Sequence, residues 1–193
     1  MARTKDPDTG RRILAATVEL MCQLGIDRMT VEQVAALSGA AKTSIYRRWP
    51  TKAALVIDAV SSVMNPPVTP DTGSLRDDLV GYFTAMTSDP RSDLMTRLFL
   101  AILDTAQRDP ELDRLRMEIV ANRRRPVRTV LELAQLRGQI NASIDIDLAT
   151  ELLLSVATYR RFVLREPLLA DQLEATIDLV LGGFVTPLVH PTT

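Results

Sequence analysis

The sequence is poor in the residues that bind metals and carry much of enzyme catalysis. Its 193 residues include one cysteine, Cys22, and one histidine, His190. An internal disulfide is therefore excluded, and a zinc site, which needs several such ligands, is not expected. A catalytic pair of serine or cysteine with histidine would depend on His190, which lies in a predicted tail. We expect no metal site, no cofactor and no enzymatic activity.

Long apolar runs are also missing. No run of 18 or more apolar residues occurs, so no membrane-spanning helix and no membrane partner are expected. The first segment, MARTKDPDTGRR, is charged and lacks the apolar stretch of a signal peptide, which predicts a cytoplasmic protein. Aromatic residues make up only 4% of the chain, but apolar residues make up 46%, enough to bury a sizeable core.

Charge is distributed unevenly along the chain. Residues 1–65 carry nine Lys and Arg and six Asp and Glu, a formal charge of +3, whereas the remaining residues carry a charge of −4. A basic segment joined to an acidic one is typical of a protein that places one end on phosphates.

Apolar periodicity and capping residues predict four helices in the first third of the chain. Thr30 followed three residues later by Gln33 is a capping box, so a helix begins at Val31. Pro50 ends the third helix, because the residue before a proline disfavours helical geometry. The four predicted helices span residues 12–25, 31–38, 41–49 and 52–64.

The remainder is also predicted to be helical. Residues 65–73 contain three prolines and a glycine and form a link between two parts of the chain. Pro126 falls inside a long helical pattern, which predicts either a kink or two helices. No stretch alternates as a strand would, so the expected fold is all-α. The predicted helices span residues 74–88, 90–108, 110–138, 145–165 and 170–189.

The second and third helices match the helix-turn-helix arrangement, in which two short helices are joined by a tight turn containing glycine. The second helix of such a pair enters the major groove of DNA. Ala41, Ile45 and Trp49 lie four residues apart and are expected to face inward. The opposite face carries the side chains suited to bases and phosphates: Lys42, Thr43, Tyr46 and Arg47.

These residues resemble a known signature. The stretches Thr30-Val-Glu-Gln-Val-Ala35, Ser38-Gly39 and Lys42-Thr-Ser-Ile-Tyr-Arg-Arg-Trp-Pro-Thr-Lys52 are similar to the N-terminal signature of TetR-family transcriptional regulators. The resemblance spans about residues 10–60, roughly a quarter of the chain. Trp49 stands where phenylalanine is commoner in that family.

The resemblance implies an all-α homodimer with a three-helix DNA-binding domain over residues 1–50. A helical-bundle domain over residues 51–193 would bind a ligand and dimerise. The implied function is a repressor that binds a palindromic double-stranded operator and is released by an unknown small molecule. The implied DNA contacts are Thr30, Lys42, Thr43, Tyr46, Arg47, Arg48 and Lys52.

Two further groups of residues in the second part of the chain are candidate sites. Apolar residues of the last two predicted helices form either ordinary core or a dimer interface: Leu152, Val156, Ile177, Leu181 and Phe184. Aromatic, methionine and isoleucine residues form either core or the lining of a ligand pocket: Tyr82, Phe83, Met86, Met95, Phe99, Ile102, Met117 and Tyr159.

Three consecutive arginines, Arg123 to Arg125, precede Pro126. They form either a solvated helix face or the entrance to a site for an acidic ligand. At the level of the whole protein two alternatives to a regulator remain. The first is a helical interaction protein whose helix-turn-helix is only scaffold, and the second is an enzyme, which the missing catalytic residues disfavour.

Overall fold

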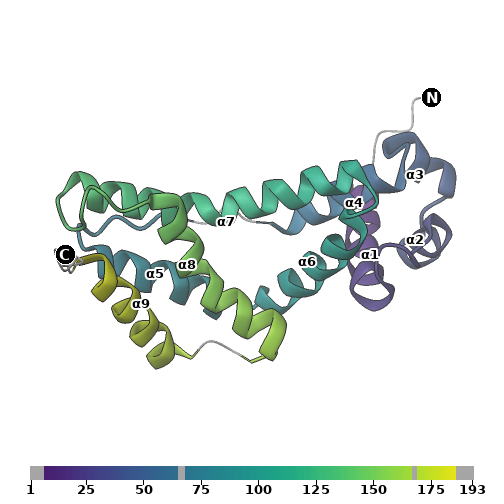
Figure 1. Ribbon diagram of the computed structural model, residues 1–193. Helices are drawn as coiled ribbons and strands as arrows, with labels where there is room; N and C mark the ends of the chain where they lie inside the picture. Colours follow the sequence, from purple (N-terminus) through teal and green to yellow (C-terminus); the bar gives the residue numbers. More distant parts are fainter. Residues whose placement is uncertain (1–6, 65–67, 167–168, 186–193) are drawn as a thin grey trace. The chain divides into compact units, whose positions relative to one another are not determined.

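The computed structural model describes residues 7–64, 68–166 and 169–185 and confirms the all-α fold. Within these ranges the chain forms nine α-helices, one π-helical turn and no strand (Figure 1). The α-helices are α1 (Pro7–Leu24), α2 (Val31–Ser38), α3 (Lys42–Arg48), α4 (Lys52–Val63), α5 (Leu75–Ser88), α6 (Ser92–Ala106), α7 (Pro110–Leu136), α8 (Ile146–Tyr159) and α9 (Ala170–Val185), and the π-helical turn is η1 (Arg160–Leu164).

The helices divide into two compact units, each with its own apolar core. The head unit contains α1 to α4, α6 and α7 as far as Ile119, and the body unit contains α5, the rest of α7, α8, η1 and α9. Helices α4 and α6 therefore belong to the same compact unit as α2 and α3, the two helices of the helix-turn-helix. The chain passes between the two units at residues 65/66, 92/93 and 119/120, and only the first of these crossings lies in the predicted proline-rich link.

The core of the head unit is built around α1. Ile13 and Leu55 are completely buried, and α1 packs against both α2 and α4. The turn after α1 is tied to the end of α6, because Asp27 accepts hydrogen bonds from Arg108 at 2.6 Å and from Thr105 at 3.3 Å. The turn between α1 and α2 is thus held by residues about eighty positions further along the chain.

Both ends of α2 are capped as the sequence predicts. The Thr30 hydroxyl accepts a bond from the Gln33 backbone N–H at 3.2 Å, and the Gln33 side chain accepts one from the Thr30 N–H at 2.8 Å. Gly39 ends the helix with φ +66°, a left-handed conformation that glycine adopts without strain. The turn into α3 is therefore encoded locally.

The helix α3 is anchored by two apolar side chains on its inner face. Ile45 is 0% exposed, and Trp49 is 7% exposed and donates its indole N–H to Asp58 of α4 at 2.7 Å. The expectation that Ala41 also faces inward is wrong, since Ala41 is exposed. It precedes the first residue of the helix, where the extended backbone turns its methyl group away from the core.

The core of the body unit joins α5, α7, α8 and α9 through large apolar side chains such as Phe83 and Leu131. Ion pairs hold its outer surface. Arg76 of α5 donates to Asp178 and Glu174 of α9 at 2.6 Å and 3.0 Å, and both carboxylates lie on the same face of that helix.

Most helix boundaries lie within about two residues of the predictions, but α1 begins at Pro7, five residues earlier than predicted, and the body unit shows two further differences. Helix α7 continues through the buried Pro126, so the alternative of two separate helices is wrong. The helix predicted to reach residue 165 changes at Arg160 into η1 and ends at Arg165, which has φ +58°. Residues 186–189, predicted as the end of the last helix, lie outside the described residues.

We expect the substitution Ile45→Ala to lower the free energy of unfolding by about 2–5 kcal/mol, because it leaves a cavity beneath α3. Urea denaturation followed by circular dichroism measures this change. The matched control is Tyr46→Ala, the neighbouring and exposed residue, which should change stability by no more than about 0.5 kcal/mol. Equal effects of the two substitutions would contradict the assignment of faces to α3.

Candidate nucleic-acid interface

The outer face of α3 presents polar and basic side chains to solvent. Lys42, Thr43, Tyr46 and Arg47 are exposed, as the helical spacing predicts. Because Ile45 and Trp49 occupy the opposite side, the four side chains share one surface. Thr30 precedes α2, the first helix of the same helix-turn-helix, and its hydroxyl caps that helix.

Lys42 is engaged by a carboxylate that sequence reasoning missed. Its ammonium group lies 2.6 Å from the Glu32 carboxylate of α2, and both side chains are more than half exposed. The hydrogen bond from Lys42 holds the pKa of Glu32 below its usual value. An ammonium has three donors, so Lys42 can keep this bond and still donate to a base or phosphate. Glu32 places a negative charge beside the recognition helix.

Two other basic candidates are also tied to the head unit. The Lys52 ammonium donates to the backbone carbonyl of Asp27 at 3.2 Å, which fixes the start of α4 against the turn between α1 and α2. The Arg48 guanidinium lies over Gly10 of α1, where an added Cβ atom would approach it to 2.6 Å. Arg48 is therefore half-buried against α1, whereas Arg47 is exposed.

The eight pocket candidates are divided between the two cores. Ile102 is buried in the head unit, where Met95 and Phe99 pack against the same core. Tyr82 and Phe83 are buried in the body unit, with ring centroids 5.2 Å apart in an edge-to-face contact. Of the remaining three candidates, Met86 packs against the core of the body unit, and Met117 and Tyr159 are exposed.

The three consecutive arginines have different surroundings. Arg125 is exposed, and Arg124 pairs with Glu151 at 2.8 Å and with Asp147 at 3.3 Å. Arg123 is half-buried, and burial lowers the pKa of its guanidinium, as does the positive charge of Arg161 to a smaller extent. The interpretation as a solvated helix face therefore holds for Arg125 and fails for Arg123.

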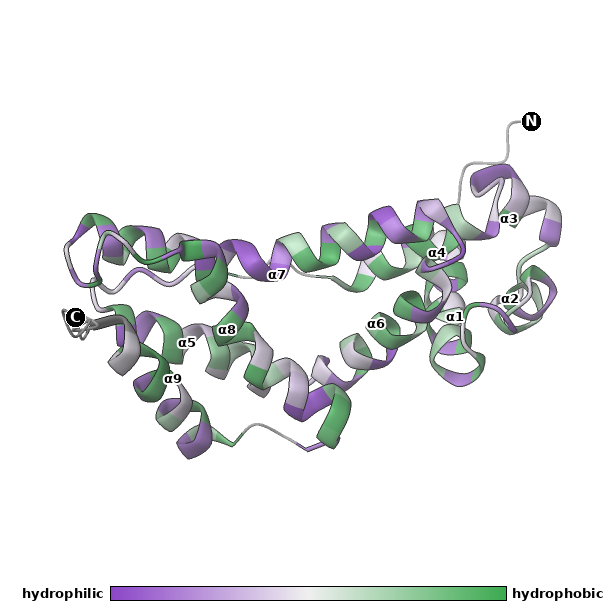
Figure 2. Cartoon of the chain, viewed as in Figure 1, coloured by the Kyte–Doolittle hydropathy of each residue, from purple (hydrophilic) through white to green (hydrophobic). Residues whose placement is uncertain are grey.

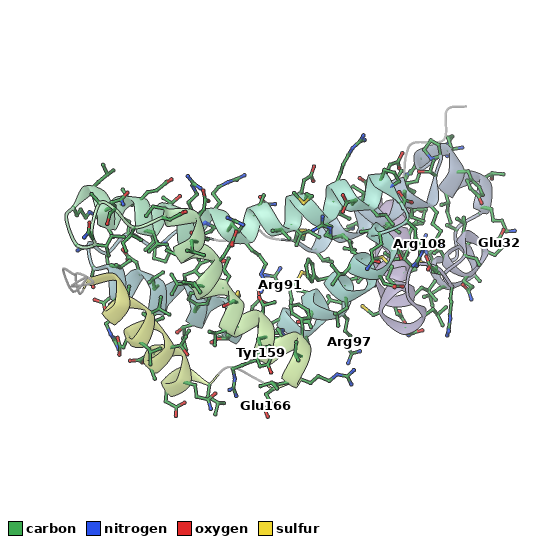
Figure 3. The ribbon with its side chains drawn as sticks, in the orientation of Figure 1. Glu32, Arg91, Arg97, Arg108, Tyr159 and Glu166 are labelled. Carbon is green, nitrogen blue, oxygen red and sulfur yellow. The ribbon has the colours of Figure 1, made fainter. Side chains whose placement is uncertain are left out.

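The dimer candidates also differ in exposure. Leu152 is exposed, Val156 and Leu181 are half-buried, and Ile177 is 1% exposed, packed in the core of its own body unit. The side chain of Phe184 lies outside the described residues. Exposed apolar side chains recur at helical spacing along α8 and into η1 and form one stripe: Leu148, Leu152, Tyr159 and Val163. Leu164 of η1 is exposed as well. Figure 2 shows hydrophobic residues along α8, and Figure 3 shows the side chain of Tyr159 near the end of this helix.

Two features are absent from the described residues, a membrane-spanning helix and a cluster of metal-binding side chains. Within residues 7–64, 68–166 and 169–185, no helix is long and apolar enough to cross a membrane. The same residues contain no group of three or more His, Cys, Asp or Glu side chains placed to hold a metal ion. His190 lies outside the described residues.

Comparison with known proteins identifies the class. The family described as bacterial regulatory proteins of the tetR family matches residues 13–59, and the family described as tetracyclin repressor-like, C-terminal domain, matches residues 69–180. The second match alone covers more than half of the chain. The chain therefore belongs to the TetR family, as the resemblance of its N-terminal signature predicts.

Individual relatives agree with this assignment. An uncharacterised HTH-type transcriptional regulator of Mycobacterium tuberculosis is 33% identical over 171 residues, which cover 88% of this chain and 84% of that protein. The DNA-binding transcriptional repressor TetR of Mycobacteroides abscessus is 30% identical over 179 residues, which cover 91% and 93%. The crystal structure of the TetR family transcription regulator SCO0332 matches with a TM-score of 0.62 and 29% identity, covering 93% and 100%. The protein is a helix-turn-helix transcriptional regulator.

We expect the substitution Glu32→Gln to raise the affinity for random-sequence duplex DNA by up to about fivefold, the range of a single surface charge pair. The change removes a negative charge beside α3 and frees Lys42 from its ion pair. Fluorescence anisotropy at low salt, where surface charges are least screened, gives the clearest measurement.

The matched control for this substitution is Glu19→Gln, which removes the same charge from the exposed side of α1. It should leave DNA affinity unchanged. An identical increase for both variants would mean that only net charge matters and that Glu32 has no special place beside the DNA surface.

Proposed function

We propose that the protein is a dimeric repressor that binds a palindromic operator through α3 and is released from it by a small-molecule ligand. The observation that supports this most directly is the exposed face of α3, where four side chains suited to bases and phosphates stand opposite a buried anchor. The relative from Mycobacteroides abscessus carries the name of a repressor, which favours repression over activation. Such a protein acts on chromosomal DNA and therefore in the cytoplasm.

In this proposal the DNA-binding residues divide by role. Lys42, Thr43 and Tyr46 enter the major groove, where they meet base edges and thymine methyl groups. Arg47, Arg48, Lys52 and Thr30 contact phosphates on either side of the groove and fix the position of the helix without reading sequence. The DNA-binding domain corresponds to residues 1–50.

A second copy of the chain is needed because one α3 reads only one half-site. The exposed apolar stripe of α8 and η1 is the surface that we propose pairs with its equivalent in the partner, together with α9. Leu179 of α9 is 81% exposed, and Gly182 and Gly183 allow helices to approach closely. A two-fold dimer buries the same patch on both subunits, which removes this apolar surface from water.

The ligand would bind within residues 51–193 and shift the dimer between a form that fits the operator and one that does not. A ligand changes such an equilibrium only by the difference in its affinity for the two forms. A hundredfold loss of operator affinity requires about 2.7 kcal/mol of coupling, and the operator must then weaken ligand binding by the same factor.

The experiment that tests the function is a DNA-binding assay on the sequence upstream of the protein's own gene, compared with random DNA. We expect footprints over two half-sites about 34–36 Å apart or a multiple of that spacing. If six to eight phosphates are neutralised by a dimer, log affinity should fall with log salt at a slope of about −5 to −7. A slope near zero, or no preference for any palindrome, would contradict the proposal.

The substitution Lys42→Ala should lower operator affinity by about 1–3 kcal/mol and relax the preference at one base position. Lys52→Ala should instead weaken binding to operator and random DNA by the same factor, because phosphates carry no sequence information. The ratio of the two affinities, measured for each variant, separates the roles. An unchanged ratio in Lys42→Ala would show that Lys42 does not read bases.

The substitution Leu152→Glu should convert the dimer to a monomer at micromolar concentration, because it buries an unpaired charge in an apolar seam. Light scattering coupled to gel filtration measures the mass. The control is Thr158→Glu, which adds the same charge at an exposed position of α8 beside the apolar stripe and should leave the dimer intact. A dimer that survives Leu152→Glu would place the interface elsewhere.

A further inference from the structure

Arg123 of α7 differs from the many arginines of the body unit that form ion pairs with carboxylates. Arg76, Arg124, Arg128, Arg137 and Arg160 all form ion pairs with carboxylates. Among the described residues, Arg123 has no carboxylate within ion-pair distance and is nevertheless half-buried. A buried charge without a partner is costly, so a guanidinium kept in this position is expected to have a use.

The donors of Arg123 are poorly satisfied by the protein. One Nη atom donates to the thioether sulfur of Met86 on α5 at 3.2 Å, and thioether sulfur is a weak acceptor. The described residues contain one fully buried side-chain nitrogen or oxygen without a hydrogen bond, Oε1 of Gln172, and it does not belong to Arg123. The guanidinium nitrogens of Arg123 that lack a hydrogen bond are therefore not fully buried.

The backbone beside Arg123 is held in place by an aromatic side chain. The Tyr82 hydroxyl of α5 donates to the Arg123 carbonyl at 2.9 Å. Pro126 has no N–H to donate to the Asn122 carbonyl four residues earlier, so α7 lacks one internal bond next to Arg123. The Tyr82 hydroxyl gives the neighbouring Arg123 carbonyl a bond from outside the helix, which fixes where the guanidinium begins.

The surroundings of Arg123 on α5 are apolar. Met86 contacts the guanidinium, and the Tyr82 and Phe83 rings pack on the same side of α5. Arg161 adds a second positive charge from η1, where the wider π-helical turn alters the direction of the side chains at the end of α8. Such irregular turns are common at functional sites. Positive charge and apolar surface thus occur together inside one unit.

We propose that Arg123, supported by Arg161, binds the carboxylate of the effector, and that the effector is an organic acid with an apolar body. A guanidinium matches a carboxylate by two parallel hydrogen bonds, and the pairing is strengthened where water is scarce. The half-buried Met86 contacts the apolar part, and the buried rings of Tyr82 and Phe83 pack on the same side of α5. This inference rests on the proposed function, because it names the chemical class of the ligand that releases DNA.

The test compares two dyes that share one aromatic body. 8-Anilino-1-naphthalenesulfonate carries an anionic group, and N-phenyl-1-naphthylamine lacks it, and both fluoresce when bound to apolar surface. The full-length protein should bind the anionic dye at least about tenfold more tightly than the neutral one. Arg123→Met should lower the affinity for the anionic dye by roughly tenfold to a hundredfold, the range for a hydrogen bond to a charged group. It should leave the affinity for the neutral dye unchanged.

A matched control comes from the same run of arginines. Arg125→Met removes an exposed charge two residues away and should leave the affinity for both dyes unchanged. Arg123→Lys, which keeps the charge, should retain part of the preference. Decanoate should displace the anionic dye from the unmodified protein, and decan-1-ol should not.

Two outcomes would overturn the inference. In the first, Arg123→Met and Arg125→Met lower the affinity for the anionic dye by the same factor. In the second, the unmodified protein binds the two dyes with equal affinity. Methionine has nearly the length of the arginine stem and removes a buried charge, so the variant should fold; Arg123→Gln provides a second one. Circular dichroism melting checks both.

Failure of this inference can be told apart from failure of the proposed function by a gel-shift with operator DNA. If a neutral compound releases DNA and Arg123→Met responds to it as the unmodified protein does, the repressor stands and the carboxylate site is wrong. If Arg123→Met loses anion binding but anions never alter DNA affinity, the site stands and the release mechanism is wrong.

Discussion

The DNA-binding surface depends on the burial of two side chains of α3, Ile45 and Trp49. A helix of seven residues cannot form stably in water, because its few hydrogen bonds do not offset the cost of nucleation. Ile45 enters the core of the head unit, and the indole of Trp49 is fixed to Asp58 of α4 by a hydrogen bond. Because these two side chains fix the inner face of α3, the opposite face lies in solvent. The exposure of the DNA-facing side chains is therefore a consequence of packing on the other side.

Charge pairing restrains the same surface before any DNA arrives. Lys42 is held by Glu32 and Lys52 by the carbonyl of Asp27, so each ammonium group has a fixed starting position. The ion pair of Lys42 with Glu32 is exposed, so salt screens it and it contributes little to stability, whereas Lys52 donates to a neutral carbonyl. Their effect is on geometry: less side-chain freedom is lost on binding DNA when the side chain is already oriented. Asp27 extends this arrangement to α6 through Thr105 and Arg108.

The body unit uses arginine in two different ways. Along its surface, arginines pair with carboxylates on neighbouring helices, which aligns α5 with α9 and α7 with α8. Arg123 lies one residue before one of these paired arginines and yet has only a sulfur atom as its acceptor. A rotation of about 100° per residue is enough to turn one side chain toward the core and the next toward a carboxylate. The contrast is what makes Arg123 a candidate for ligand binding.

The local features of this protein were determined by its sequence alone. Thr30, Gln33, Gly39 and Pro50 act through bonds within a few residues, so the helix boundaries and the helix-turn-helix follow from them. Tertiary structure decided what depends on distant partners. Glu32 meets Lys42 across 10 positions and Asp27 meets Arg108 across 81, and helical periodicity cannot signal either pair. Whether an apolar residue is core or surface was likewise decided by packing: Ile177 and Leu152 look alike in sequence, but neighbouring helices cover only Ile177.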